Sequence, residues 1–206
     1  MSSLANCRLY GFIDTGYVAG RNAAELTRAL IAGGVDIIQV RAKELAHAQR
    51  VELALAVIGV AFRHRVPVII NDDMDAAFET GADGVHLGQE DWAAVDKDKL
   101  ATMRIVGIST HTLAQAQQAE RDGANYIGVG PVFATGTKPT VQPVGVELVK
   151  QVAGRVAIPF FAIGGITLKN LRDVQTAGAT RVAVVSAILA APDVAKAASQ
   201  FKEKLK

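Results

Sequence analysis

Two acidic side chains follow predicted strands that are neighbours along the chain. Asp72 comes just after the apolar run 66–70, and Asp91 comes just after the run 84–87. Neighbouring parallel strands end at the same edge of a sheet, so both carboxylates can reach one point. At ~4 Å and an effective dielectric constant near 20, two bare carboxylates would repel by about 4 kcal/mol, unless a cation or a shared proton lies between them. The pattern favours Mg²⁺ that keeps water and phosphate ligands. The alternative is helix capping by Asp72 or Asp73 and by Asp91.

Paired cations follow the preceding predicted strand, at residues 35–40. Arg41 and Lys43 are two residues apart, so they point the same way from an extended segment. Two cations beside an acidic metal site are typical of a pyrophosphate clamp. The alternative is a salt bridge to Glu44 or to a neighbouring loop.

The longest connection, residues 131–145, is rich in Thr, Gly and Pro. A loop of this length in a compact chain is more often functional than not. Lys138 lies in it and is a candidate lid residue.

A glycine pair and a serine mark a second anion site. Gly164 and Gly165 follow the predicted strand at 159–163, and Val185 and Ser186 begin the last part of the chain. Backbone N–H groups at such positions hold a phosphate monoester in many barrels of this type. The pattern therefore predicts a phosphorylated ligand, and the alternative is a pair of simple turns.

Two further polar residues lie on predicted strands. Ser109 and His86 lack the companions that a Ser-His-Asp hydrolase needs. Ser109 at a strand end is placed to hydrogen-bond the edge of a polar ring. His86 lies among apolar residues and is either a satisfied core histidine or a ligand contact.

The elements that position these residues alternate between strand and helix. Glycines after each helical stretch repeat in the phrases AGGVD, TGADG, DGANY and AGATR, which precede the even-numbered strands. The sequence predicts an α/β fold, a single (β/α)8 TIM barrel over residues 1–206. The predicted strands are 8–13, 35–40, 66–70, 84–87, 104–108, 126–129, 159–163 and 181–185. The predicted helices are 23–32, 46–63, 74–79, a stretch after Asp91, 113–121, 168–176 and the C-terminus.

Composition excludes several other classes of protein. The chain has 206 residues, a formal charge of +2 and one cysteine, Cys7. A charge this mild, without basic runs interleaved with aromatics, argues against nucleic acid as a partner. No run approaches the ~18 apolar residues of a membrane span, and no signal peptide is evident. We therefore expect a cytoplasmic protein that binds small molecules, with no membrane partner; the sequence does not predict its oligomeric state.

Several separated strings, in order, resemble the thiamine-phosphate synthase (pyrophosphorylase) family from Leu9 to about Ala190. They are QVRAK, IIND, GVHLGQED, GISTHT, YIGVGPVFATGTKP, FFAIGGI and VAVVSAI. The resemblance implies a transferase that joins an aminopyrimidine methyl diphosphate to a thiazole phosphate, giving thiamine phosphate and pyrophosphate. The implied mechanism is dissociative and needs no protein nucleophile.

The resemblance also assigns residues. It implies Mg²⁺ held by Asp72 and Asp91. It implies that the pyrimidine and its diphosphate are bound by Gln39, Arg41, Lys43, Asn71, Ser109 and Lys138, and that the thiazole phosphate is bound by Thr135, Thr137, Gly165, Val185 and Ser186. The expected catalytic residues are Arg41, Lys43, Ser109 and Lys138.

Departures from the family pattern are small. Ala42 stands where the family often has an acid, and the end of the first strand is atypical, so Asp14 is assigned no role. The alternatives are a thiazole tautomerase-like relative or a phosphate-ligand sensor on the same barrel. A sugar-phosphate isomerase or epimerase is a third, but it has no use for a second diphosphate clamp.

Overall fold

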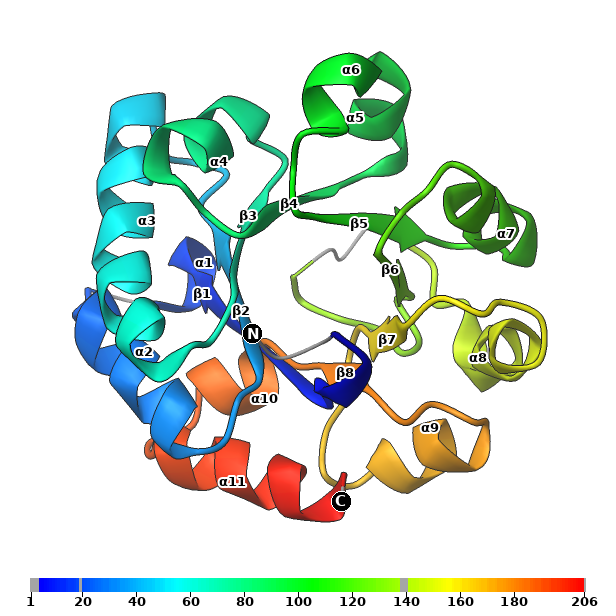
Figure 1. The fold of residues 1–206 in the computed structure, drawn as a ribbon. Coiled ribbons are helices and arrows are strands. Elements are labelled where there is room, and N and C mark those ends of the chain that lie inside the picture. The colour runs from blue at the N-terminus through cyan, green and yellow to red at the C-terminus, as the bar shows by residue number, and fades with distance from the viewer. Residues whose placement is uncertain (1–3, 19, 138–140, 206) are drawn as a thin grey trace.

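Eight parallel strands close into a barrel, and the helices form a ring around it (Figure 1). The computed structural model describes residues 4–18, 20–137 and 141–205. The strands are β1 (Leu9–Asp14), β2 (Ile37–Arg41), β3 (Val68–Asn71), β4 (Gly84–Leu87), β5 (Ile105–Thr110), β6 (Tyr126–Val129), β7 (Phe160–Ile163) and β8 (Val182–Ala183). Each strand pairs with the next one in sequence, and β8 pairs with β1. The predicted (β/α)8 barrel is therefore confirmed.

The helices follow the strands in order. They are η1 (Leu4–Asn6), α1 (Thr15–Val18), α2 (Ala23–Ala32), α3 (His47–Ala61), η2 (Phe62–His64), α4 (Met74–Thr80), α5 (Gln89–Ala94), α6 (Lys97–Leu100), α7 (Leu113–Arg121), α8 (Gly145–Ala153), α9 (Leu171–Thr176), α10 (Ser186–Leu189) and α11 (Val194–Lys204). The sequence interpretation assigned no helix between the sixth and seventh strands, where the structure has α8.

Some predicted boundaries are wrong for local reasons. The predicted eighth strand ends early, at Ala183, because the backbone of Val185 (φ −103°, ψ −85°) leaves the extended region. The helix expected after Asp91 instead begins at Gln89, so Asp91 lies inside its first turn. The second strand begins at Ile37, after Asp36 has bonded to the start of β1 through its side chain.

The strands are buried on both faces, as expected for a parallel barrel. Alternate residues such as Tyr10, Phe12 and Phe161 fill the barrel interior. The residues between them, such as Leu9 and Ile13, pack against the surrounding helices. Polar side chains lie at the strand ends and at a few interior positions such as Gln39 and His86.

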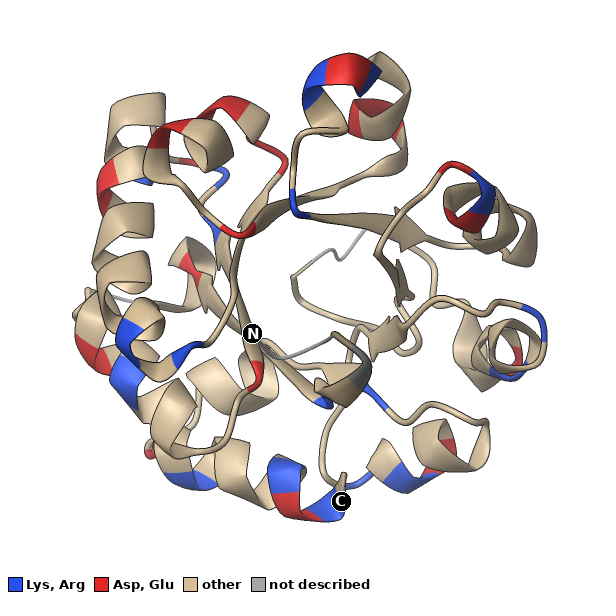
Figure 2. Ribbon diagram, in the orientation of Figure 1, with Lys and Arg blue, Asp and Glu red and all other residues tan. Residues whose placement is uncertain are grey.

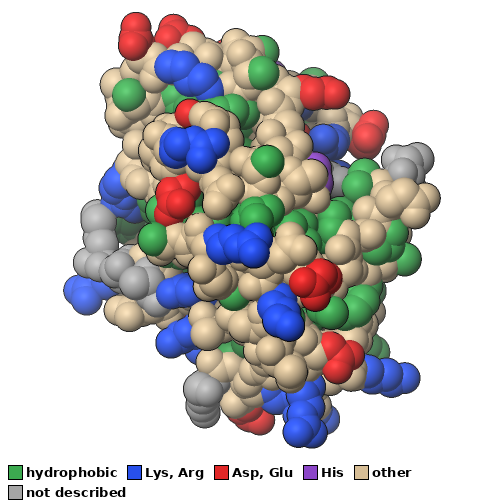
Figure 3. Space-filling model, turned by 90° about the vertical axis from the view of Figure 1, so that its right-hand side faces the viewer, with side chains coloured by type: hydrophobic (Ala, Val, Ile, Leu, Met, Phe, Trp, Pro, Cys, Tyr) green, Lys and Arg blue, Asp and Glu red, His purple; other side chains and the backbone are tan. Residues whose placement is uncertain are grey.

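Charged residues lie mainly on the outer helices and the loops (Figure 2). On the face shown in Figure 3, cationic and anionic side chains are interspersed with hydrophobic ones. Among the described residues, no helix has the length and apolar character needed to cross a membrane.

Candidate active site

An acidic cavity lies beyond the ends of β3 and β4. Asp72 and Asp91 both line it, together with Lys43. The ammonium of Lys43 is 3.0 Å from Asp72 Oδ2. Partial loss of hydration and the neighbouring charge of Asp72 raise the pKa of Asp91, so the two carboxylates are close enough to repel each other.

The carboxylates have different backbone settings. Asp72 adopts a left-handed conformation with φ 61°, and its N–H bonds to the carbonyl of His86 at 2.9 Å. The cap of α4 is Asp73, whose Oδ1 accepts from the N–H of Ala76 at 2.8 Å. Capping therefore accounts for Asp73 and leaves Asp72 free to face the cavity. Asp91 does take part in a cap, because its Oδ2 accepts from the N–H of Gly88 at 3.3 Å.

The donor set of this cavity fits a hard divalent cation. Two carboxylates are brought together, and the described residues contain no group of three or more His, Cys, Asp or Glu suited to a metal. Two protein ligands leave most positions of an octahedral ion to water and substrate oxygens, as is usual for Mg²⁺. A cation bound between the two carboxylates would offset their mutual repulsion.

Arg41 lies at the end of β2, opposite Asp14 in the β1–β2 register. Its Nη1 is 2.9 Å from Asp14 Oδ2, and the side chain of Asp14 is only 1% exposed. The other oxygen, Oδ1, accepts from the N–H of Gly16 at 2.9 Å. Asp14, to which the sequence assigned no role, thus fixes both the guanidinium and the start of α1.

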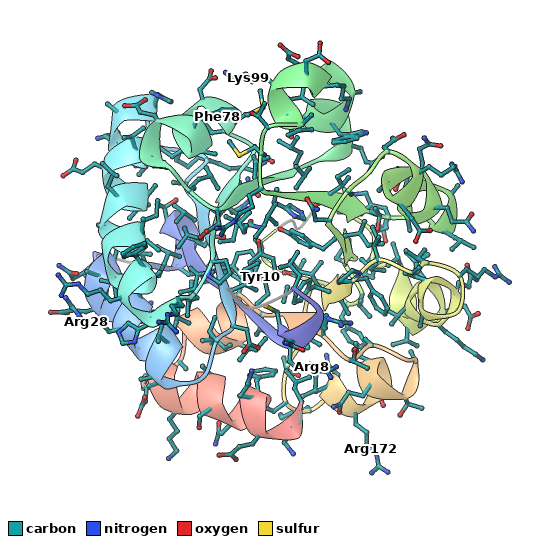
Figure 4. All side chains as sticks on the ribbon, in the orientation of Figure 1. Arg8, Tyr10, Arg28, Phe78, Lys99 and Arg172 are labelled. Carbon is teal, nitrogen blue, oxygen red and sulfur yellow. The ribbon has the colours of Figure 1, made fainter. Side chains whose placement is uncertain are left out.

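The floor of the central cavity is a chain of hydrogen bonds inside the barrel; its tyrosine Tyr10 is labelled in Figure 4. Gln39 Nε2 donates to the Tyr10 hydroxyl at 2.9 Å, and that hydroxyl is 2.9 Å from the hydroxyl of Tyr126. His86 Nδ1 is 3.0 Å from Tyr126 Oη, and His86 Nε2 is 2.9 Å from Ser109 Oγ. We call these five residues the floor chain. Burial raises the pKa of both tyrosines, so both remain neutral phenols.

Two glycine residues lie against the side chains of the floor chain. A Cβ on Gly107 would lie 2.1 Å from Tyr126 Cζ, and a Cβ on Gly128 would lie 3.4 Å from Cε1 of His86. Gly107 is therefore required by the tyrosine ring that crosses it. At Gly128 the addition would make a close but ordinary contact.

Glycines also shape the opposite side of the mouth. Gly164 and Gly165 have φ of 98° and 63°, and a Cβ on Gly165 would lie 2.4 Å from the carbonyl oxygen of Ala134. Both line the central cavity together with Val185 and Ser186. The first N–H groups of a helix such as α10 have no partner within the helix, so they are available to an anion.

The loop after β6 reaches this side of the cavity. Thr135 and Thr137 line it, and the Thr137 hydroxyl is 3.2 Å from the hydroxyl of Tyr17 in α1. Lys138, the predicted lid residue, lies outside the described residues.

The chain matches the family model described as thiamine monophosphate synthase over residues 9–188. It is 42% identical to the thiamine-phosphate synthase of Chloroflexus aurantiacus over 203 residues, which cover 98% of this chain and 94% of the relative. The chain belongs to the thiamine monophosphate synthase family. The family resemblance seen in the motifs is thereby confirmed.

Other members of the thiamine monophosphate synthase family are comparably similar. The thiamine-phosphate synthase of Shouchella clausii is 43% identical, with 94% of this chain and 93% of the relative covered. The solved thiamine phosphate pyrophosphorylase from Pyrococcus furiosus is 31% identical and superposes with a TM-score of 0.86, covering 97% and 95% of the two chains. The fold agrees with the family at the level of the backbone as well as the sequence.

Sequence reasoning missed several polar residues of this thiamine monophosphate synthase barrel. Tyr10 and Tyr126 were included only as parts of predicted strands, and His111, which also lines the central cavity, was not singled out. The available signal was the hydroxyl group itself, since a fully buried tyrosine needs a hydrogen-bond partner. The identity of that partner depends on strands far apart in the sequence.

Proposed function

We propose that this protein is a thiamine-phosphate synthase that joins an aminopyrimidine methyl diphosphate to a thiazole phosphate and releases pyrophosphate. One observation carries the proposal beyond family membership: two separate groups of residues suited to binding anions lie at the carboxyl ends of the strands. The first is the cation and carboxylate cluster beyond β2, β3 and β4. The second is the glycine cradle beyond β7 and β8. A reaction that joins two phosphorylated substrates needs both sites, and an isomerase needs one.

The diphosphate would lie on the cationic side. Arg41 is anchored by Asp14, which leaves its remaining N–H donors for phosphate oxygens. The Lys43 side chain is 47% exposed and its ammonium pairs with Asp72. The ammonium could therefore turn from Asp72 to an incoming phosphate with little change in the burial of the side chain. Asn71 lines both cavities and so lies where the diphosphate and the pyrimidine would meet.

We further propose Mg²⁺ as the cofactor, held by Asp72 and Asp91 and by the diphosphate. Bound there, the ion would neutralise charge that develops on the departing pyrophosphate. The protein's own part is to hold two carboxylates at one point and to supply cations from Arg41 and Lys43. Lys138 is proposed as a further cation for the same group.

The thiazole phosphate would lie on the glycine side. Gly165, Val185 and Ser186 would bind it through backbone N–H groups, and Thr135 and Thr137 through hydroxyls. This placement would orient the thiazole nitrogen toward the pyrimidine methylene carbon. No side chain needs to act as a nucleophile, because departure of pyrophosphate leaves a cation that the aminopyrimidine ring stabilises. Positioning of the two substrates then supplies much of the rate.

The test is release of pyrophosphate with both substrates, with and without Mg²⁺, alongside detection of thiamine phosphate. The proposal expects metal-dependent release that matches the product one for one. Asp91→Asn should lower turnover by about two orders of magnitude or more. Glu90→Gln, which changes the exposed neighbouring acid in the same turn of α5, is the matched control and should retain turnover.

Metal-independent turnover, or full activity of Asp91→Asn, would contradict the metal assignment. Binding of thiazole phosphate without pyrophosphate release would instead indicate a tautomerase-like or sensing relative.

A further inference from the structure

The floor chain links five residues from five different strands into one line of hydrogen bonds. It runs from Gln39 through Tyr10, Tyr126 and His86 to Ser109. Gln39 is 3% exposed, His86 is 8% exposed and Tyr126 is fully buried. The two ends, Gln39 and Ser109, both line the central cavity. The other three residues also line it, but their side-chain polar atoms are paired with one another or with the ends, so the two ends carry the hydrogen-bonding groups left for a ligand.

The proton positions along this line depend on one another. With the Gln39 amide oriented as in this structure, its N–H donates to the oxygen of Tyr10. A phenol has one proton, so Tyr10 donates to Tyr126 and Tyr126 donates to Nδ1 of His86. The ring proton then lies on Nε2 and is donated to Ser109 Oγ. The opposite direction would leave the Tyr10 proton without an acceptor within these five residues, and an unmatched buried donor is unfavourable.

This direction fixes what the two ends offer to a ligand. Oε1 of Gln39 is left as an acceptor, beside the second N–H of its Nε2, and the hydroxyl of Ser109, which already accepts from His86, keeps its own proton to donate. An acceptor and a donor on one floor match a heterocycle with an exocyclic amino group and an unprotonated ring nitrogen. A 4-oxo ring would set its carbonyl oxygen against the Gln39 acceptor. Turning the amide to suit it would require every proton of the chain to reverse.

We propose that Tyr10, Tyr126 and His86 are positioning residues that set the hydrogen-bond polarity of the floor, so that the site selects a 4-aminopyrimidine over its 4-oxo counterpart. The selection of a pyrimidine rests on the proposed function, whereas the hydrogen-bond direction of the floor chain does not. None of the three positioning residues needs to exchange a proton with the substrate.

The polarity is tested directly by the tautomer of His86. The chain has four histidines, and ¹⁵N-histidine labelling with a His86→Gln sample assigns the His86 signals. In the ligand-free protein near neutral pH, the proton should be on Nε2, with Nδ1 unprotonated. A proton on Nδ1, or a doubly protonated ring, would overturn the inference, whatever the enzyme's activity.

Selectivity is tested by calorimetric binding of 4-amino-5-hydroxymethyl-2-methylpyrimidine and its 4-oxo analogue. The wild type should bind the amino compound about ten-fold or more tightly, since one opposed hydrogen bond is a difference of that order. Tyr126→Phe breaks the line in the middle and should reduce the ratio to about two- or three-fold. Thr110→Val is the matched control: it removes a buried hydroxyl that bonds to the Gly128 carbonyl, outside the floor chain, and should keep the wild-type ratio.

The outcomes separate the inference from the proposed function. A wild-type ratio in folded Tyr126→Phe would overturn the positioning role. If His86 carries its proton on Nε2 but neither pyrimidine binds, the aminopyrimidine is not the substrate. The proposed selectivity for the 4-amino ring is then also wrong. If thiamine phosphate forms but the His86 proton is on Nδ1, the proposed function is supported and the proposed hydrogen-bond direction of the floor chain is wrong.

Discussion

At the scale of single residues, the backbone of Asp72 is the most unusual feature of the acidic cavity. Its φ of 61° lies in the left-handed region, which Gly visits freely, Asn and Asp occasionally adopt, and most other residues avoid. The conformation is held by the bond from the Asp72 N–H to the His86 carbonyl, which ties the cavity to β4. Strain of this kind persists where the surrounding structure fixes it, often at functional sites.

Substitutions of Asp72 should therefore separate stability from activity. We expect Asp72→Gly to be at least as stable as the wild type and Asp72→Ala to be less stable than Asp72→Gly by about 1 kcal/mol, because only alanine pays the left-handed penalty. Both should lose metal-dependent turnover. Urea unfolding together with pyrophosphate release measures the two effects. An alanine variant as stable as the glycine variant would mean that the backbone at this position relaxes freely.

A second residue-scale feature lies on the outer surface, where His47 is between two acids. Its Nε2 is 2.9 Å from Glu79 Oε2, and its Nδ1 is 3.2 Å from Asp73 Oδ2. These hydrogen bonds raise the pKa of His47 above its usual value of 6.5. The contact joins α3 to α4 when the imidazole is charged.

The stability supplied by His47 should depend on pH. Its folded pKa is raised, so the contribution is fully present below pH 6.5 and is lost as the pH rises through the raised value. We expect the melting temperatures of wild type and His47→Ala to differ more at acidic pH than at alkaline pH. A gap that widens toward alkaline pH would contradict the ion-pair role. The effect should be small, since the side chain is exposed.

At the scale of elements, one device recurs at the end of the barrel away from the site. Each even-numbered strand is preceded by a left-handed glycine, at positions 34, 81, 123 and 178. The residue two places later bonds through its side chain to the start of the preceding odd strand in three cases. Asp36 accepts from Leu9, Asp83 from Val68 and Asn125 from Val106.

Removing one of these links should affect stability alone. We expect Asn125→Ala to lower the free energy of unfolding by about 1–2 kcal/mol, because the N–H of Val106 loses its 2.7 Å partner. The rate of turnover should stay at the wild-type level, because the active face is at the other end of the strands. Denaturant unfolding and steady-state kinetics on one preparation measure both. Lost turnover with unchanged stability would show that this end communicates with the site.

These elements also show which features of the fold can be predicted from the sequence. The repeated phrases predicted the glycine turns correctly, because a helix end that needs positive φ favours glycine. The role of Asp36 or Asn125 was hidden, since their partners lie on strands 19 or more residues away. The floor chain is the extreme case: Tyr10 and Tyr126 are 116 residues apart, and only closure of the barrel brings them together. Strand-end residues could be proposed because their chemistry is local, whereas side-chain pairing across the interior could not.

At the scale of the whole molecule, the barrel sets the two proposed anion sites on either side of one floor, with Asn71 lining both cavities. The cationic side carries the protein's own carboxylates, so an anion without a metal meets both attraction and repulsion there. Binding of metal and diphosphate should therefore be mutually dependent.

Thermal stability should report this dependence. Mg²⁺ and pyrophosphate together should raise the melting temperature by roughly 5 °C or more at about one hundred times Kd, and each alone should raise it much less. Asp91→Asn should abolish the joint effect, and Glu90→Gln should retain it. Additive shifts from the two ligands would indicate separate sites.

The close approach of Gly107 to the Tyr126 ring limits which sequences this barrel accepts. Even a methyl group at position 107 would occupy the volume of the ring. A chain with alanine there would have to shrink residue 126 in the same step, and the phenol would go with it. Position 107 can thus gain a side chain only together with a smaller residue at 126, whereas residue 126 can change alone. A conservative-looking change on β5 would then remove the phenol from the floor chain while leaving the residues of the two proposed anion sites unchanged.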